Sequence, residues 1–96
     1  MKVILFSNDG CGSCRLWKPT FIKLMDKHGL EYEVIDSFKD KDMARKYDIK
    51  GLPCTVFLNN DGNELGHILG NMIEELADRD IEYYKEKDGG LQQAQG

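Results

Sequence analysis

The sequence has little of what marks a disulfide scaffold or a membrane protein. Only 3 of its 96 residues are cysteine, an odd and small number that argues against a framework of structural disulfides. The longest uninterrupted apolar run, Val3 to Phe6, is too short for the core of a signal peptide or for a membrane span. These absences predict a cytoplasmic protein whose thiols are reactive, metal-binding or buried.

Positive charge is not in excess either. Lysine and arginine number 13 and aspartate and glutamate 17, so the formal charge is 13 − 17 = −4. Phosphate binding needs a concentrated positive field, so we expect neither a nucleic acid nor a membrane surface as partner. A hydrophobic fraction of 41% can fill one modest core, and we expect one monomeric domain over 1–84. The apolar pattern stops there, and 85–96 is interpreted as a flexible C-terminal tail.

Apolar periodicity predicts alternating strands and helices. The expected strands cover 2–6, 32–35, 54–58 and 64–69, and the expected helices cover 11–28, 40–47 and about 71–84. The first crossover helix makes the first two strands parallel, and the Asn-Asn-Asp-Gly-Asn stretch at 59–63 predicts an antiparallel hairpin. The fold class is therefore α/β in the order βαβ-α-ββ-α, with a four-stranded mixed sheet and helices on both faces.

The last helix carries a capping signal and an apolar stripe. Asn71, followed three residues later by Glu74, is typical of a capping box at a helix start. The residues that repeat with helical spacing form the expected buried face, and they are Ile73, Leu76, Ala77, Ile81 and Tyr84.

Two cysteines stand three residues apart where the first strand meets the first helix, in the motif Cys11-Gly12-Ser13-Cys14. At this spacing, in the first turn of a helix, two sulfurs can approach closely enough to form a small disulfide ring. The unpaired N–H groups of that turn and the helix dipole stabilise a thiolate at Cys11. Cys14 lies one turn deeper and is expected to be less accessible.

The implied reaction has two steps. The Cys11 thiolate attacks a substrate disulfide and forms a mixed disulfide, and Cys14 then attacks Cys11 and releases the reduced substrate. Nearby charges have opposing effects, because Arg15 and Lys18 favour the thiolate whereas Asp9 opposes it. We therefore expect Cys11 and Cys14 to be the catalytic residues, with their reversible disulfide as the redox centre and no other cofactor.

A half zinc site is the alternative interpretation of such a pair. Structural zinc needs two such pairs, or one pair with histidines at set spacing. The other nitrogen and sulfur ligands are Cys54, His28 and His67, and none has that spacing. The sequence therefore favours redox chemistry, with no metal at the pair.

The sequence resembles the thioredoxin family well beyond the cysteine pair. The matching segments keep the family's order and spacing, and they are Cys11-Gly12-Ser13-Cys14, Pro19, Tyr47-Asp48-Ile49-Lys50-Gly51-Leu52-Pro53, Thr55-Val56-Phe57-Leu58, Asp61-Gly62 and Gly70. Together they cover about 1–84, and this combination is far more specific than the pair alone.

The resemblance implies a thioredoxin-like fold and roles for several residues. Pro53 would be a cis-proline packed against the cysteine pair, and the backbone of Leu52 would pair with an extended substrate segment. The implied substrate-binding surface is flat and mostly apolar, and it consists of Gly12, Ser13, Gly51, Leu52, Pro53 and Gly70. Proteins that contain disulfides would be the substrates, and a reductase would supply electrons.

Several positions depart from the thioredoxin pattern. Gly10 stands where a tryptophan commonly precedes the first cysteine, and Ser13 stands where a proline is common. Leu5 occupies the position of the buried aspartate that commonly accepts a proton. These departures favour the smaller glutaredoxin-like members, including the reductants of ribonucleotide reductase. The paired-glycine and aspartate signature of a glutathione site is absent at Gly70-Asn71-Met72.

Cys54 directly follows Pro53, so the resemblance brings it near the pair. One interpretation is a small buried residue at the start of a strand, because free cysteine is commonly buried. The other is a third thiol that traps Cys11 or Cys14, or completes a metal or iron–sulfur site with them.

The sequence thus predicts a thioredoxin-like thiol–disulfide oxidoreductase that reduces protein disulfides. Three alternatives remain open. They are a glutaredoxin-like reductant of ribonucleotide reductase, a metal- or iron–sulfur-binding protein that uses Cys11, Cys14 and Cys54, and a module that binds a partner without turnover.

Overall fold

The computed structural model describes residues 1–89 and contains the seven expected elements in the expected order. In chain order they are β1 (Lys2–Ser7), α1 (Gly12–His28), β2 (Glu31–Asp36), α2 (Lys41–Lys46), β3 (Cys54–Leu58), β4 (Glu64–Leu69) and α3 (Glu74–Asp88). None of the helices in this described part is long and apolar enough to cross a membrane.

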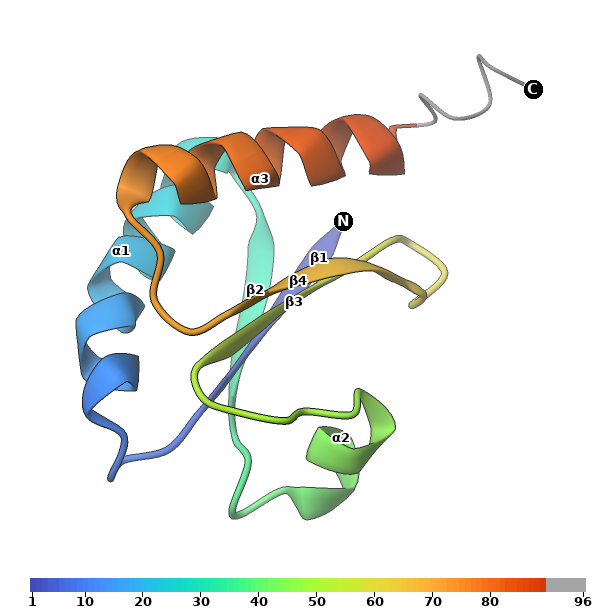
Figure 1. Cartoon of the computed structure of the whole chain (residues 1–96). Helices are drawn as coiled ribbons and strands as arrows, with labels where there is room; N and C mark the ends of the chain where they lie inside the picture. The colour runs from blue at the N-terminus through green and yellow to red at the C-terminus, as the bar shows by residue number, and fades with distance from the viewer. Residues whose placement is uncertain (90–96) are drawn as a thin grey trace.

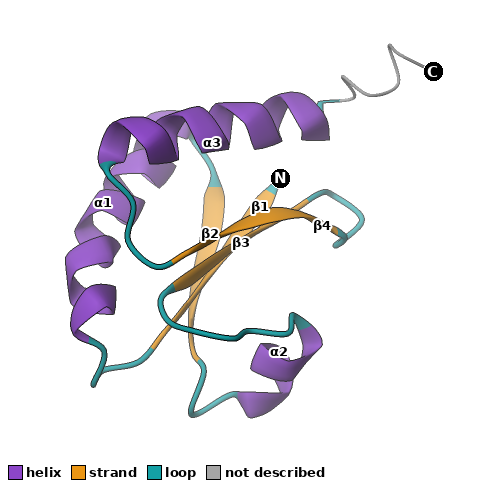
Figure 2. Ribbon diagram, in the orientation of Figure 1, coloured by secondary structure: helices purple, strands orange, loops and turns teal. Residues whose placement is uncertain are grey.

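The four strands form one mixed sheet in the order β2-β1-β3-β4. The β1–β2 pair is parallel, because α1 crosses over between them, whereas β3 is antiparallel to both β1 and β4. Figure 2 shows this twisted sheet between its helices. Helices α1 and α3 lie on one face and α2 lies on the other (Figure 1). The predicted α/β thioredoxin-like architecture is confirmed.

The central strand β1 separates two hydrophobic cores, because its side chains point alternately to the two faces of the sheet. Val3 and Leu5 belong to the core beneath α1 and α3, while Ile4 and Phe6 belong to the core beneath α2. Helix α1 contributes the predicted apolar stripe to the first core through Trp17, Phe21, Leu24 and Met25. Helix α1 is therefore anchored along its length, which fixes where its first turn lies.

The last helix begins and ends differently from the expectation. Its N-cap is Ile73, which makes no side-chain capping bond, so the predicted capping box of Asn71 and Glu74 is wrong. Ile73 and Leu76 are 65% and 45% exposed, which leaves Ala77 and Ile81 as the fully buried positions. The helix also continues past Tyr84 to Asp88. Of the predicted tail, 90–96 lie outside the described residues.

Candidate redox site

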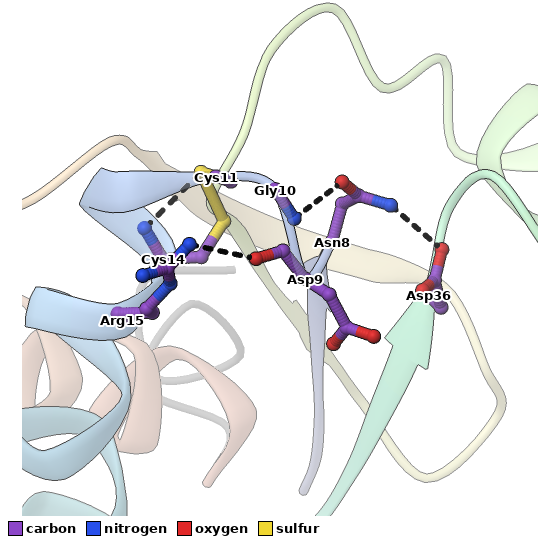
Figure 3. Close-up of a disulfide and its surroundings, with 7 residues drawn as sticks. All are labelled: Asn8, Asp9, Gly10, Cys11, Cys14, Arg15 and Asp36. Atoms are coloured by element: carbon purple, nitrogen blue, oxygen red, sulfur yellow. Dashed lines mark hydrogen bonds between the residues drawn. A yellow bond between two sulfur atoms is a disulfide. The ribbon is translucent and has the colours of Figure 1, made fainter.

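The loop between β1 and α1 is shaped by one asparagine. The Asn8 side-chain oxygen accepts a hydrogen bond from the Gly10 N–H at 2.9 Å, and its carbonyl accepts one from the Cys11 N–H at 3.0 Å. Short polar side chains favour such local turns because they satisfy backbone donors that would otherwise be unpaired. Asn8 therefore fixes the turn that delivers Cys11 to the start of α1 (Figure 3).

Asp36 holds Asn8 from the neighbouring strand. Its carboxylate accepts hydrogen bonds from the Phe38 N–H at 2.9 Å, the Lys39 N–H at 3.2 Å and the Asn8 amide at 3.4 Å. These donors, first that of Phe38, hold the pKa of Asp36 below its usual value. The sequence interpretation missed both residues. The parallel pairing of β1 and β2 could have indicated them, because it places Ser7 beside Asp36 where both strands end.

Cys11 and Cys14 form a disulfide with their Cα atoms 5.2 Å apart. Cys11 is the N-cap of α1, and its sulfur accepts a hydrogen bond from the Cys14 N–H at 3.1 Å. The predicted difference in depth is confirmed, because Cys11 is half-buried whereas Cys14 is 4% exposed. The accessible sulfur is thus the one that receives an N–H group at the positive end of the helix dipole.

A polar pocket of about 180 Å³ opens beside Cys14. Its lining consists of Ser7, Asn8, Asp9, Cys14, Arg15 and Lys18. The Arg15 guanidinium donates a hydrogen bond to the Asp9 carbonyl at 3.1 Å, and this bond links the loop between β1 and α1 to the helix. The deeper cysteine therefore borders a site that holds two basic side chains.

The predicted substrate residues from the loop before β3 lie together with Gly70. The Leu52–Pro53 peptide bond is cis, and the Pro53 side chain is fully buried. The Pro53 carbonyl accepts a hydrogen bond from the Gly70 N–H at 2.7 Å, and Gly51 lies against Leu69. Gly70 has a φ of +80°, a conformation that disfavours any side chain. Gly12 and Ser13 are exposed on the first turn of α1.

Within residues 1–89 the buried side chains of the core beneath α1 carry no charge. Leu5 on β1 pairs with Thr55 on β3, and the Trp17 indole donates a hydrogen bond to the Thr55 hydroxyl at 2.9 Å. All three side chains are buried. The position where the resemblance expects a proton-accepting aspartate thus holds Leu5, beside a neutral hydrogen-bonded pair.

Cys54 does not join the other two cysteines. It pairs with Phe6 in the sheet and shares with it the core beneath α2, on the opposite face from α1. Burial, and then the charge of Glu64, raise the pKa of the Cys54 thiol to about 11. Cys54 is a free thiol, 3% exposed. We expected Cys54 to lie within reach of the pair. This expectation is wrong, because the Cys54 side chain points toward α2, and it is the side chain of the next residue, Thr55, that faces α1.

A metal site built from the three cysteines finds no support in this geometry. Within residues 1–89, one group of side chains lies close enough to share an ion, and it consists of His28, Asp78 and Glu82. Its carboxylates are already ion-paired, Asp78 with Lys27 at 2.7 Å and Glu82 with Lys85 at 3.8 Å. This group links α1 to α3 and lies at the end of α1 opposite to the cysteine pair.

Known proteins resemble the chain along most of its length. The Thioredoxin family model matches residues 1–81. Thioredoxin H9 of Arabidopsis thaliana is 36% identical over 72 residues, which cover 74% of this chain and 51% of that protein. Thioredoxin of Pongo abelii is 32% identical over 80 residues, which cover 79% of this chain and 73% of that protein.

Solved structures show the same fold. Thioredoxin 1 of Thermosipho africanus superimposes with a TM-score of 0.80 at 22% identity, over 93% of this chain and 99% of that one. The chain spans about half the length of thioredoxin H9. The matched region contains the helix start with its disulfide, the Leu52–Pro53 bond and Gly70. The chain therefore belongs to the thioredoxin family, and Cys11 and Cys14 are its disulfide-forming CxxC pair.

Proposed function

We propose that this chain reduces disulfides of other proteins by dithiol–disulfide exchange through Cys11-Gly12-Ser13-Cys14. One observation carries the proposal: the accessible Cys11 sulfur caps α1 and accepts the Cys14 N–H at 3.1 Å, with Cys14 already bonded to it. A thiolate at a helix N-terminus is stabilised by the unpaired N–H groups and by the helix dipole. The geometry therefore suits Cys11 as the nucleophile and Cys14 as the resolving thiol.

The reaction starts from the reduced pair. The Cys11 thiolate attacks one sulfur of the substrate disulfide, and the other substrate sulfur leaves as a thiolate. Cys14 then loses its proton and attacks the Cys11 sulfur, which releases the second substrate thiolate. The substrate gains two electrons, and the pair returns to the disulfide seen in the structure.

The substrate surface in this proposal consists of Gly12, Ser13, Gly51, Leu52, Pro53 and Gly70. Two glycines support it, because a Cβ built at Gly12 or Gly70 meets no atom within 4 Å, which leaves room for another chain. The backbone of Leu52 would pair with an extended segment of the substrate, and the side chains around it would then set the fit. A separate reductase would regenerate the dithiol, in a reducing compartment such as the cytoplasm. The chain would act as a monomer.

The test uses single cysteine variants and a protein disulfide such as insulin, with dithiothreitol as the electron source. Cys11→Ser should abolish reduction, because the attacking sulfur is lost. Cys14→Ser should accumulate a mixed disulfide at Cys11, detected by mass spectrometry. Cys54→Ser is the matched control and should reduce the substrate at the wild-type rate.

Full activity of Cys11→Ser would overturn the proposal and favour a module that binds without turnover. Comparing a flavin-dependent reductase with glutathione as electron source would separate the thioredoxin-like activity from the glutaredoxin-like alternative. That alternative, a reductant of ribonucleotide reductase, differs in its partners and stays a prediction.

A further inference from the structure

We propose that Arg15 promotes the resolving step, by stabilising the thiolate of Cys14 from the polar pocket that both residues line. This inference rests on the proposed function and identifies a positioning residue for the second step of the proposed reaction. Within residues 1–89 no carboxylate is buried in the core, so none there can receive the Cys14 proton.

The uncharged surroundings follow from the residues of the core beneath α1. Leu5, Trp17 and Thr55 are buried and uncharged, and the indole of Trp17 already occupies the Thr55 hydroxyl at 2.9 Å. Burial beside such uncharged side chains disfavours the ionised form of a thiol, because the thiolate loses its hydration. Cys14 is 4% exposed, and the pocket of about 180 Å³ that it lines gives water and charge a way to reach it.

Three charged residues, Asp9, Arg15 and Lys18, line this pocket, and Asp36 contacts its lining residue Asn8. Asp36 is engaged by the Asn8 amide and by two backbone N–H groups. Figure 3 shows the Asp9 carboxylate pointing away from the two sulfurs. Lys18 lines the pocket with an exposed, flexible side chain. Of the two cations that line the pocket, Arg15 is held in place by a hydrogen bond.

The fixed position comes from the loop itself. One guanidinium nitrogen of Arg15 donates to the Asp9 carbonyl at 3.1 Å, two residues before Cys11 (Figure 3). Guanidinium stays charged at any physiological pH, and its planar fork holds a hydrogen bond with little loss of freedom. The result is a permanent cation, held by the backbone of the loop that leads to Cys11 and lining the same pocket as Cys14.

The resolving step moves one proton and exchanges one sulfur–sulfur bond for another. In the mixed disulfide, Cys14 gives its proton to water in the pocket, and the guanidinium stabilises the resulting negative sulfur. The Cys14 electron pair forms the bond to the Cys11 sulfur, and the bond between Cys11 and the substrate sulfur breaks. Its electron pair leaves with the substrate sulfur, which then takes a proton from solvent.

The experiment follows both steps in one reaction. The reduced protein is mixed with excess 4,4′-dithiodipyridine, a small disulfide that is uncharged near neutral pH and so does not bind Arg15 by charge. The first equivalent of thiopyridone reports attack by Cys11, and the second reports resolution by Cys14. Arg15→Gln is compared with Arg79→Gln, which removes the same charge from an exposed site on α3. Arg15→Lys retains a cation without the planar fork.

We expect Arg15→Gln to slow the second phase about threefold to tenfold at pH 7, as the loss of one nearby charge at a partly exposed site predicts. The midpoint of that phase's pH profile should also move to higher pH. The first phase should slow by a smaller factor than the second, because the pocket that Arg15 lines borders Cys14 and not Cys11. Arg15→Lys should restore part of the rate.

A second phase in Arg15→Gln that equals that of Arg79→Gln would overturn the inference, and so would an equal slowing of both phases. A wild-type protein that shows the first phase and no second one would instead overturn the proposed function, and this inference with it. Near-ultraviolet circular dichroism checks that each variant keeps the native packing of Trp17.

Discussion

The indole N–H of Trp17 donates a hydrogen bond to the hydroxyl of Thr55, with 2.9 Å between the two atoms. The two residues are 2% and 1% exposed, and they join the helix that carries the cysteine pair to the strand that begins just after Pro53. A polar contact in such a place is specific, because each partner loses water on burial and neither has a substitute. It therefore fixes α1 on the sheet more precisely than apolar packing alone would.

Replacing Thr55 with valine tests that contact. Thr55→Val keeps the shape of the side chain and leaves the buried indole N–H without an acceptor, so the free energy of unfolding should fall by about 1–3 kcal/mol. Urea denaturation followed by far-ultraviolet circular dichroism measures this in every variant. In a Trp17→Phe background the same Thr55→Val change should cost much less, because no donor is left unpaired. Equal costs in the two backgrounds would show that the hydrogen bond is not the cause.

Gly66 on β4 makes room for the ring of Tyr84 on α3. A Cβ at Gly66 would overlap that ring, which stacks on Phe57 at 4.8 Å between ring centroids. Gly66→Ala should therefore destabilise the protein by about 1–3 kcal/mol, as overpacking of a filled core does. Thermal or urea unfolding measures the loss. Most of it should disappear when Gly66→Ala is made in a Tyr84→Leu background, and a loss that persists there would point to the strand backbone instead.

The order of the elements could be predicted because local signals agree with the fold. The buried run of β1, the motif at Cys11 and the hairpin signal at 59–63 each specify their own segment without help from distant residues. The motif also indicated its chemistry, because two cysteines three residues apart at the start of a helix are typical of a redox-active disulfide.

What the sequence did not predict depends on contacts between distant segments. Asn71 is a good cap by type, yet Ile73 is the N-cap of α3, because the backbone is still extended at Ile73 and becomes helical from Glu74 onward. Cys54 follows Pro53 in sequence, but its pairing with Phe6 turns its side chain toward α2. The link from Asp36 through Asn8 to the loop before Cys11 joins residues 28 positions apart. Periodicity and short motifs carry no information about such pairings.

The orientation of Cys54 predicts its reactivity. With the pKa of this thiol raised to about 11, the ionised fraction at pH 8 is about one in a thousand, from 11 − 8 = 3. Reduced native protein treated with iodoacetamide at pH 8 should therefore be alkylated at Cys11 well before Cys54, as peptide mass mapping can follow. In urea the difference should vanish, because unfolding removes the burial. Rapid labelling of native Cys54 would contradict both its burial and its orientation toward α2.

Helices α1 and α3 are linked by charge at the end away from the cysteine pair. Asp78 on α3 accepts hydrogen bonds from Lys27 at 2.7 Å and from His28 at 2.5 Å. These two partners, Lys27 first, hold the pKa of Asp78 below its usual value. The His28 side chain is almost fully buried, so this contact is also where α1 ends against α3.

The lowered pKa of Asp78 makes stability depend on pH in one direction. A carboxyl group of this kind contributes fully above its unfolded pKa of about 4, and the contribution disappears as pH falls through the lower folded value. Asp78→Asn should therefore be less stable than wild type at pH 7, and the two proteins should converge as pH falls to about 2. Urea unfolding across this range measures the convergence. Asp26→Asn, at an exposed carboxylate on α1, is the control and should change stability little at either pH. If the difference in the free energy of unfolding between Asp78→Asn and wild type were the same at every pH, the substitution would act through packing rather than through charge.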